Sequence, residues 1–340
     1  MAERVKITII GAGVVGCAIA YQLSKKYDEI FVIEKNPRVT AENQSSRNSG
    51  VIHAGIYYPK HESPLKAKLC VQGNRMLYDF CQEFDVPHRQ TGKLVMATED
   101  WQLDYLRDTF QIARQNDVPG AKIISDEAAK QMEPNIHCIQ AAYFPTSGIV
   151  EPTQLVHRLF ARASQNGVYF LTQTEVIDIK PKNGYFEIAT KSGNQIDIFE
   201  TEILINSAGL YSDEIGRKIN PDCPYDLFPV RGEMAKFYKS RRQDIFHAGM
   251  NLYPVPHPLD AMGKKLVIQF DEFQKLFKAK KVLKTVGVHL TPTFDLIEGQ
   301  YEIGNTVTIG PATKGVSDKE DHTHDLYPPE YYFELVHPFF

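Results

Sequence analysis

Residues 5–34 read VKITIIGAGVVGCAIAYQLSKKYDEIFVIE and carry the strongest structural signal in the chain. The run Val5–Ile10 is dense in β-branched residues and predicts a buried strand. Residues Val14–Tyr27 have the spacing of small and apolar side chains that is typical of a helix. Ile30–Ile33 predicts a second buried strand, which ends at Glu34. Together these segments predict a complete β-α-β unit and a parallel α/β fold.

Gly11, Gly13 and Gly16 form a GxGxxG motif between the first strand and the helix. Glycines at these positions permit a tight turn, the approach of a pyrophosphate to backbone amides, and close packing of helix on strand. The helix N-terminus adds a partial positive charge that attracts phosphate. Glu34 lies 18 residues after Gly16, where a carboxylate accepts both ribose hydroxyls and repels a 2′-phosphate. The unit predicts NAD or FAD rather than NADP, against the alternative of glycines that only build a turn.

The loop after the second strand contains the stretch SSRNSGVIHAGIYY at residues 45–58. Its glycines and small polar residues suit a second contact on a long cofactor, and His53 is placed to reach a reactive ring. An NAD enzyme does not normally use such a loop directly after its second strand, so the stretch favours FAD. The alternative is a surface loop with an incidental histidine.

Composition and charge exclude several classes of protein. The 340 residues are 43% hydrophobic and 24% charged, which is typical of a globular chain of about two domains. A formal net charge of -4 provides no overall positive field for nucleic acid or an anionic membrane. The five cysteines form no CxxC pair, and no spacing predicts a metal site. We therefore expect reduced thiols, no bound metal and no nucleic-acid partner.

The N-terminal segment predicts the location of the protein. The first strand begins by Val5, which leaves no room for a signal or transit peptide. The longest apolar stretch, Ile7–Ala20, is too short and too rich in glycine to span a bilayer. We expect a cytoplasmic protein whose membrane contact is at most peripheral, at the inner face of a membrane.

These motifs, together with LKAKLCVQGN at 65–74 and INSAGLYSDEIG at 205–216, resemble the D-amino-acid oxidase-like family of FAD-dependent flavoproteins. Within that family they are most similar to the L-2-hydroxyglutarate dehydrogenase and oxidase group. FPVRGE at 228–233 and GVHLT at 287–291 are similar as well. Glycerol-3-phosphate dehydrogenases have a similar His-Gly loop, so the loop by itself does not identify the substrate.

The resemblance implies an α/β fold in which a Rossmann-like FAD-binding domain is interleaved with an antiparallel-sheet substrate domain, as in glutathione reductase and D-amino-acid oxidase. Residues 1–80 and 145–220 would form the FAD-binding domain, and residues 81–144 and 221–340 the substrate domain. The same resemblance implies that FAD binds in extended form. Its contacts would be Gly11, Gly13, Val14, Val15, Gly16, Glu34, Lys35, Ser45, Ser46, Asn48, Ser49, Gly50, Val51, His53, Val176, Ala208 and Gly209.

The resemblance also implies the reaction, which is oxidation of L-2-hydroxyglutarate to 2-oxoglutarate by hydride transfer to the flavin. Five residues would bind substrate or move the proton: His53, Tyr57, Arg231, Tyr253 and His289. The guanidinium of Arg231 suits two parallel hydrogen bonds to a carboxylate, and either histidine suits the role of general base. Alternatively, Arg231 pairs with Glu233 on a strand surface, and His289 is a satisfied core histidine.

Other functions stay open at the level of sequence. A related flavin enzyme acting on another 2-hydroxy acid, an amino acid or glycerol 3-phosphate fits the same motifs. So do an NAD-dependent dehydrogenase and an inactive FAD-binding protein. Oxygen, a quinone or an electron-transfer protein would each serve as electron acceptor.

Two features depart from the family pattern. Pro292 follows the HLT run, where a basic residue is common in the group. The resemblance also leads us to expect that the chain lacks the family's C-terminal segment, because its end reads ELVHPFF and nothing in it resembles that segment, and we expect Phe339 and Phe340 to be exposed. We therefore expect a truncated or degenerate member with impaired FAD binding.

Overall fold

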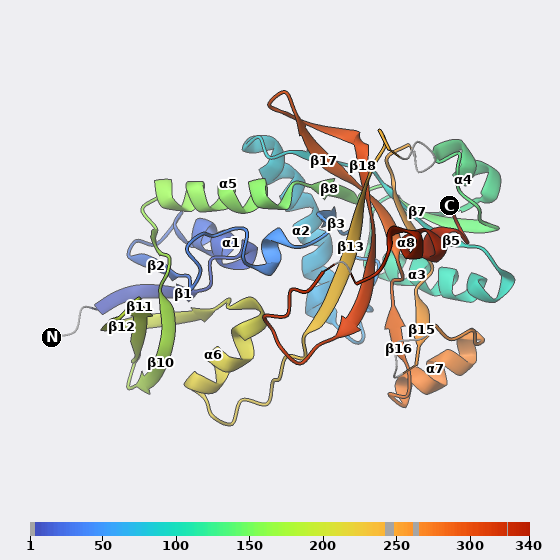
Figure 1. Ribbon diagram of the computed structural model, residues 1–340. Coiled ribbons are helices and arrows are strands. Elements are labelled where there is room, and N and C mark those ends of the chain that lie inside the picture. The colour runs from blue at the N-terminus through green and yellow to red at the C-terminus, as the bar shows by residue number, and fades with distance from the viewer. Residues whose placement is uncertain (1–3, 242–247, 261–264, 325) are drawn as a thin grey trace. The chain divides into compact units, whose positions relative to one another are not determined.

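The computed structural model describes residues 4–241, 248–260, 265–324 and 326–340, and these form two compact units (Figure 1). Unit 1 comprises residues 1–48, 152–229 and 317–319. Unit 2 comprises residues 49–151, 230–316 and 320–340. No helix in the described ranges has the length and apolar character needed to cross a bilayer.

Unit 1 contains a six-stranded sheet with the order β10-β11-β12-β1-β2-β9. The strands β12, β1, β2 and β9 run parallel, and β10 and β11 form an antiparallel extension. Helices α1 and α5 pack against each other beside the parallel strands (Figure 1). The elements are β1 (Arg4–Ile10), α1 (Val14–Leu23), β2 (Ile30–Ile33), η1 (Gln44–Ser46), α5 (Pro152–Gln165), β9 (Tyr169–Leu171), β10 (Glu175–Lys182), β11 (Tyr185–Ser192), β12 (Gln195–Asn206), η3 (Gly209–Tyr211) and α6 (Ser212–Ile219).

Unit 2 contains a seven-stranded mixed sheet with the order β13-β18-β17-β14-β5-β7-β6 and two small antiparallel sheets. The strands are β3 (Val51–Ile52), β4 (His88–Arg89), β5 (Lys93–Ala97), β6 (Lys122–Ser125), β7 (Gln140–Phe144), β8 (Gly148–Val150), β13 (Val230–Tyr238), β14 (Asn251–Pro254), β15 (His257–Leu259), β16 (Leu283–Thr285), β17 (His289–Ile297) and β18 (Gln300–Gly315). The helices are α2 (Pro64–Glu83), η2 (Asp100–Gln102), α3 (Leu103–Gln115), α4 (Asp126–Met132), α7 (Phe270–Lys278) and α8 (Pro329–Val336).

The seven-stranded sheet sorts its side chains according to the two-residue period of a strand. One face is apolar and packs with α4 and α8 in a single core, which contains Leu94, Met96, Leu252, Leu290, Ala129, Tyr332 and Val336. The other face carries Lys93, Val95, Tyr253 and His289. Val95 lies opposite Tyr253 in the parallel pair of β5 and β14, and Lys93 points to the same face two residues earlier.

The C-terminal aromatic residues differ from the sequence expectation. The side chain of Phe339 is 2% exposed and belongs to the core with α8, and Phe340 packs against the same core. The carbonyl of Phe339 also accepts the backbone N–H of His137 at 2.9 Å. The expectation of two exposed phenylalanines was therefore wrong, because in the turn after α8 the N–H groups of Phe339 and Phe340 both donate to the carbonyl of Val336, at 3.0 Å, and both rings pack against the apolar core.

The unit boundaries fall after Asn48, Glu151 and Pro229, whereas the sequence-based boundaries lie at residues 80, 144 and 220. Helix α2 accounts for the first difference. Its buried Asn74 donates hydrogen bonds to the carbonyls of His53 and Thr146, at 2.9 Å each. These bonds tie the segment that follows Asn48 to other parts of unit 2.

Candidate functional site

The turn between β1 and α1 requires glycine at two positions. Gly11 has a φ of +98°, and a Cβ there would lie 2.5 Å from the carbonyl oxygen of Ser207. A Cβ on Gly16 would lie 1.8 Å from the carbonyl oxygen of Gly11. No side chain fits at either point, so the turn brings the start of α1 directly against β1 as the motif predicts.

Glu34 is held in place at the end of β2. Its side chain is 6% exposed, and its Oε2 accepts the backbone N–H of Ala12 at 2.8 Å. Its Oε1 accepts the N–H of Asn36 at 3.0 Å. Each oxygen of an ionised carboxylate has a further lone pair, so Glu34 can still accept the hydroxyls of a ribose.

The segment 41–48 folds over the N-terminus of α1. The hydroxyl of Ser45 accepts the backbone N–H of Val14 at 2.9 Å, and a Cβ on Gly13 would lie 3.0 Å from the same oxygen. Asn48 donates to the carbonyl of Ser45 at 2.9 Å, and the hydroxyl of Ser46 accepts the N–H of Ala41 at 2.9 Å. The side chain of Val15, on the first turn of α1, is 58% exposed. Small polar groups thus surround a helix N-terminus that suits a phosphate.

A second turn of unit 1, after β12, lies against the first. The hydroxyl of Ser207 donates toward the carbonyls of Ile10 and Gly11, at 2.8 and 3.1 Å. A Cβ on Gly11 would also lie 3.1 Å from the Cα of Ala208, so Ala208 and Gly209 start beside the glycine motif. Val176 belongs to the same apolar core as Ile10 and Ala208. Lys35 lies over the ring of Tyr211, with its Nζ 3.6 Å from the ring centroid.

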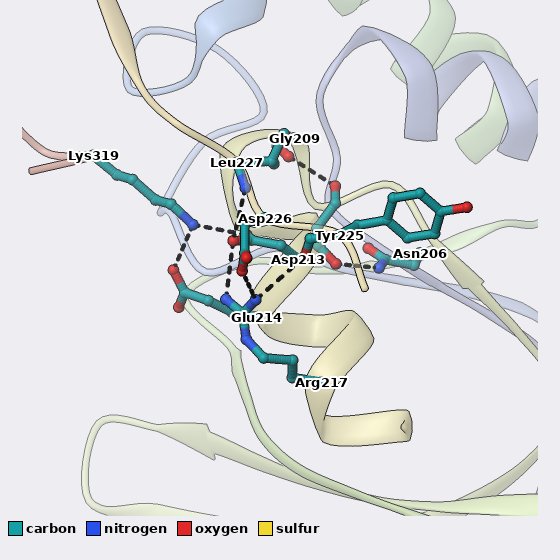
Figure 2. A network of polar contacts seen from close by, with 10 residues as sticks. Asn206, Gly209, Asp213, Glu214, Arg217, Tyr225, Asp226, Leu227 and Lys319 are labelled. Atoms are coloured by element: carbon teal, nitrogen blue, oxygen red, sulfur yellow. Dashed lines mark hydrogen bonds and ion pairs between the residues drawn. The ribbon is translucent and has the colours of Figure 1, made fainter. Parts of the chain in front are cut away.

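Helix α6, which follows this second turn, is anchored by an ionic network around Asp213 (Figure 2). One oxygen of Asp213 accepts from the ammonium of Lys319 at 2.7 Å. The other accepts from Arg217 at 2.9 Å and from the backbone N–H of Leu227 at 3.2 Å. Burial alone would raise the pKa of Asp213, but these hydrogen bonds outweigh burial and hold the pKa far below its usual value.

These features of unit 1 fit a dinucleotide. The two forced glycines, the held carboxylate of Glu34 and the polar cover of the α1 N-terminus are the contacts that a pyrophosphate and a ribose require. The geometry of the turn agrees with the contacts expected from the motif, and which residues hold the adenine half of FAD stays a prediction.

Four polar side chains of unit 2 lie together on one face of its larger sheet. Three of them were predicted from the sequence, and the fourth, Lys93, was not. The Nζ of Lys93 lies 3.6 Å from the ring centroid of Tyr253 and 5.3 Å from that of Tyr57. The ring of Tyr253 stacks on that of His289, with centroids 3.9 Å apart. We call Tyr57, Lys93, Tyr253 and His289 the lysine cluster. Lys93, Tyr253 and His289 meet because β5, β14 and β17 are neighbours in the sheet, and Tyr57 reaches them from the loop between β3 and α2.

Several polar atoms of the lysine cluster are buried and unpaired. Lys93 is 0% exposed and His289 is 4% exposed. Within the described ranges, the Nζ of Lys93, the hydroxyl of Tyr57 and the Nε2 of His289 have no hydrogen-bond partner. Buried polar groups in proteins are normally paired, so such a concentration of unpaired ones indicates a site that a ligand completes.

Burial also shifts the protonation of this cluster. It lowers the pKa of Lys93 to about 7 and that of His289 to about 3. For His53, burial together with the charge of Lys93 lowers the pKa to about 3. Both imidazoles are therefore neutral at physiological pH. The Nδ1 of His289 lies 3.0 Å from the carbonyl of Gly287 and must donate to it, which leaves the lone pair on Nε2.

Two asparagines that the sequence analysis did not single out hold the loop before Tyr57. Asn74 donates to the carbonyl of His53, and Asn116 donates to the carbonyls of Gly55 and Tyr58 at 2.7 and 2.8 Å. The ring centroids of His53 and Tyr57 lie 6.3 Å apart. The carbonyls of His53, Gly55 and Tyr58 thus each accept a hydrogen bond from an asparagine side chain, and these bonds hold the backbone on which His53 lies. Asn74 lies in the 65–74 stretch that carried the family resemblance, but its role is visible only in the structure.

Ser49, Gly50 and Val51, which were also predicted to contact the cofactor, lie in unit 2 as well. Val51 pairs with Ile149 in the short sheet of β3 and β8, and the carbonyl of Gly50 accepts the N–H of Val150 at 2.8 Å. Ser49 begins this segment. Their predicted contacts with the cofactor stay a prediction.

Arg231 is engaged in an ion pair. Its guanidinium donates to Asp321 at 2.9 Å, and its side chain is 12% exposed. The alternative pairing with Glu233 does not occur, since Glu233 accepts instead from the hydroxyl of Tyr332 at 2.7 Å. Lys93 was the residue that sequence reasoning missed, although a lysine at the head of the apolar run KLVMA was a visible signal.

Comparison with solved structures shows the fold. The FAD-bound L-alpha-glycerophosphate oxidase from Mycoplasma pneumoniae superposes with a TM-score of 0.73 at 23% identity, covering 94% of this chain and 73% of that one. Glycine oxidase from Geobacillus kaustophilus gives a TM-score of 0.67 at 19% identity, with coverage of 93% and 73%. The predicted α/β fold is confirmed, and the larger sheet of unit 2 is antiparallel except for the parallel pair of β5 and β14.

Curated relatives are similar in sequence over part of their length. L-2-hydroxyglutarate dehydrogenase from Indibacter alkaliphilus is 34% identical over 258 residues, 74% of this chain and 62% of that protein. The human mitochondrial L-2-hydroxyglutarate dehydrogenase is 34% identical over 261 residues, 74% of this chain and 55% of that protein. A glycerol 3-phosphate dehydrogenase from Caloramator mitchellensis is 36% identical over 229 residues, 67% and 46% respectively. The chain thus spans about half to three-fifths of the length of these relatives.

The family model described as FAD dependent oxidoreductase matches residues 6–326. This match confirms the family predicted from the motifs and, with it, FAD as the cofactor. The chain belongs to the FAD dependent oxidoreductase family.

Proposed function

We propose that this protein oxidises L-2-hydroxyglutarate to 2-oxoglutarate. The observation that carries the proposal is the lysine cluster, where a buried ammonium, a phenol and an imidazole lone pair are all unpaired within the described ranges. An α-hydroxy acid offers a carboxylate and a hydroxyl, which match an ammonium and an imidazole. Relatives named L-2-hydroxyglutarate dehydrogenase at 34% identity support this choice of substrate.

FAD, when bound, supplies the acceptor for the hydride that leaves the α-carbon of the substrate. The residues that would hold its adenine half are Gly11, Gly13, Gly16, Glu34, Ser45 and Ala208. We further propose that the segment from Ser49 to His53 contacts the remainder of the cofactor.

The hydroxyl proton of the substrate needs a base, and unit 2 offers two: His289 of the lysine cluster, and His53, whose ring lies beside that of Tyr57. His289 is held with its Nδ1–H on the carbonyl of Gly287, so its Nε2 lone pair is free to take the proton. His53 stands near Tyr57 on a loop that Asn74 positions, and its imidazole is neutral as well. As the proton moves to the imidazole, the C–O bond becomes a carbonyl and the electron pair of the C–H bond leaves as hydride.

The other predicted substrate residues have supporting roles in this proposal. Tyr57 and Tyr253 stay protonated because burial raises the pKa of both phenols, and each phenol can donate a hydrogen bond. Arg231 is proposed to bind the second carboxylate of the substrate, which would require it to share its guanidinium with Asp321.

Glycerol 3-phosphate is a second candidate substrate, because the 36% identical relative from Caloramator mitchellensis is a glycerol 3-phosphate dehydrogenase. Another 2-hydroxy acid or an amino acid would use the same site. The electron acceptor of the second half-reaction is proposed to be oxygen, a quinone or an electron-transfer protein. We further propose a cytoplasmic location with at most peripheral membrane contact, which fractionation of the native host would test.

The experiment that tests the function is an anaerobic visible spectrum of the FAD-loaded chain before and after substrate. We expect L-2-hydroxyglutarate to bleach the flavin band and 2-oxoglutarate to appear in equal amount. The D-enantiomer, L-lactate, glycine and glycerol 3-phosphate serve as parallel substrates.

The outcomes separate the alternatives. Bleaching by glycerol 3-phosphate alone would replace the proposed substrate with the second candidate. A loaded flavin that none of the panel reduces would contradict the proposed activity and leave an inactive FAD-binding protein.

A further inference from the structure

We propose that Lys93 binds the α-carboxylate of the substrate. The inference rests on the proposed function, because it takes the ligand of the lysine cluster to be a 2-hydroxy acid. It assigns the anion-binding role to a residue that neither the motif nor the predicted Arg231 supplies.

The placement of Lys93 is the first argument. It is the first residue of β5, an interior strand of the seven-stranded sheet between β14 and β7, and it is 0% exposed. The faces of Tyr253 and Tyr57 lie near its ammonium, and aromatic faces attract a cation. They provide no negative charge, however, and the structure shows no carboxylate paired with Lys93 among the residues it describes. A buried ammonium without a counter-charge is costly, which is understandable if a ligand supplies that charge.

The charges around Lys93 are the second argument, and they come from every element that faces it. Tyr57 and Tyr253 are neutral phenols, and His53 and His289 are neutral imidazoles. On α2, burial raises the pKa of Cys70, which keeps its thiol neutral. Lys66, also on α2, is exposed and lies over the ring of Tyr58.

One buried positive charge therefore calls for one negative charge. A carboxylate carries a single negative charge and would neutralise Lys93 completely. A phosphate ester carries a charge of about −1.5 to −2 near neutral pH and would leave an excess buried negative charge. At Lys93 itself the cluster thus favours one carboxylate over the phosphate of glycerol 3-phosphate, and the second carboxylate of L-2-hydroxyglutarate is left to Arg231, as proposed above.

A proton linkage follows from the same burial. The pKa of Lys93 is lowered to about 7 in the free protein, so part of the population is neutral at and above that pH. A bound carboxylate stabilises the ammonium and raises this pKa. Binding above pH 7 is then accompanied by proton uptake at the Nζ of Lys93.

The test uses glutarate, a dicarboxylate without an oxidisable hydroxyl, titrated calorimetrically into the FAD-loaded chain at pH 8. Titrations in two buffers of different ionisation enthalpy give the number of protons taken up. The variants are Lys93→Met, which keeps the volume without the charge, and Lys93→Gln, which keeps a hydrogen-bond donor. Lys122→Met is the matched control, since Lys122 also lies over a tyrosine ring, Tyr143, in the same sheet but is exposed.

We expect Lys93→Met and Lys93→Gln to weaken glutarate binding by about 30-fold or more and to abolish proton uptake, with Lys122→Met within about twofold of the parent. A structural role for Lys93 would lower the melting temperature of Lys93→Met, whereas a ligand-binding role predicts a higher one. Equal glutarate affinity in the parent and Lys93→Met would overturn the proposal, as would a parent that binds no glutarate. Tighter Lys93-dependent binding of inorganic phosphate would overturn the choice of carboxylate. Lys93-dependent glutarate binding without flavin reduction by L-2-hydroxyglutarate would reject only the proposed function.

Discussion

Asp213 in unit 1 and Lys93 in unit 2 are both buried charges, at 5% and 0% exposure, but their surroundings are opposite. Asp213 accepts hydrogen bonds from Lys319, Arg217 and a backbone N–H (Figure 2). Lys93 has aromatic faces around it and no hydrogen-bond partner within the described ranges. The protein itself supplies the hydrogen-bond partners of Asp213. It supplies none for Lys93 within the described ranges, and we propose that a ligand does so.

The pKa shifts express the same difference. Burial disfavours the charged form of both groups. For Asp213 the hydrogen bonds outweigh burial, and the carboxylate is more stable than in water. For Lys93 burial dominates, and the pKa falls to about 7 because nothing comparable opposes it. A buried charge that stabilises the fold and one that serves binding can thus be distinguished by their partners.

The largest effect is expected from the histidines of unit 2. Changing His289 or His53 to Asn keeps a similar shape but removes a base, so we expect flavin reduction to slow by about 10²–10⁴-fold for the residue that takes the proton. Stopped-flow absorbance under anaerobic conditions measures this rate. The variant of the residue that is not the base should retain a rate within about tenfold of the parent, and two near-normal variants would exclude the lysine cluster as the reacting site.

Removing the paired charge should cost stability. Asp213→Ala leaves Lys319, Arg217 and the N–H of Leu227 without their shared acceptor, and we expect unfolding to become easier by about 3 kcal/mol. Denaturant unfolding followed by circular dichroism gives the free energy. Because the pKa of Asp213 is lowered in the folded protein, its contribution is present above the unfolded pKa and is lost as the pH falls through the folded pKa. An unchanged midpoint would show that the network is not stabilising.

Removing the unpaired charge of Lys93 should raise the free energy of unfolding rather than lower it. We expect Lys93→Met to stabilise the ligand-free protein by about 2 kcal/mol at pH 7, because it removes the desolvation of an ammonium. The unfolded chain binds more protons than the folded one between pH 7 and 10.5, so the stability of the parent rises through this window. The variant should lack that rise. Thermal melts from pH 6 to 10.5 compare the two slopes, and a destabilised variant would show that Lys93 supports the fold.

The smallest effect is expected at the exposed edge of the network. Glu214 also accepts from Lys319, at 2.8 Å, but its side chain is 48% exposed. An ion pair at the surface contributes little, so Glu214→Gln should change the unfolding free energy by at most about 0.5 kcal/mol. The same denaturant titration measures this variant beside Asp213→Ala. A loss as large as that of Asp213→Ala would show that the network acts as one unit rather than through its buried carboxylate.

The local parts of the fold and of the cofactor site could be read from the sequence. Within residues 5–34, the strand, the turn, the helix and Glu34 are close in the chain and obey short-range rules. The steric requirement at Gly16 comes mainly from the carbonyl of Gly11 in the same stretch, whereas a Cβ on Gly11 would meet Ser207 and Ala208 from the distant turn after β12. Local sequence therefore predicted the dinucleotide turn, and the 45–58 loop, together with the family resemblance, favoured FAD over NAD.

Tertiary structure decided which polar side chains meet. Lys93 lies 160 residues before Tyr253, and His289 follows 36 residues after it, so only the strand order β17-β14-β5 places the three on one face. The lysine at the head of KLVMA could be noticed in the sequence, but that its ammonium is buried without a hydrogen-bond partner in the described ranges became known only with its neighbours. Arg231 shows the reverse, because only the fold brings Asp321 to its guanidinium. Periodicity acts over a few residues, whereas burial and charge pairing depend on contacts between distant segments, and for this reason they appear only in the folded chain.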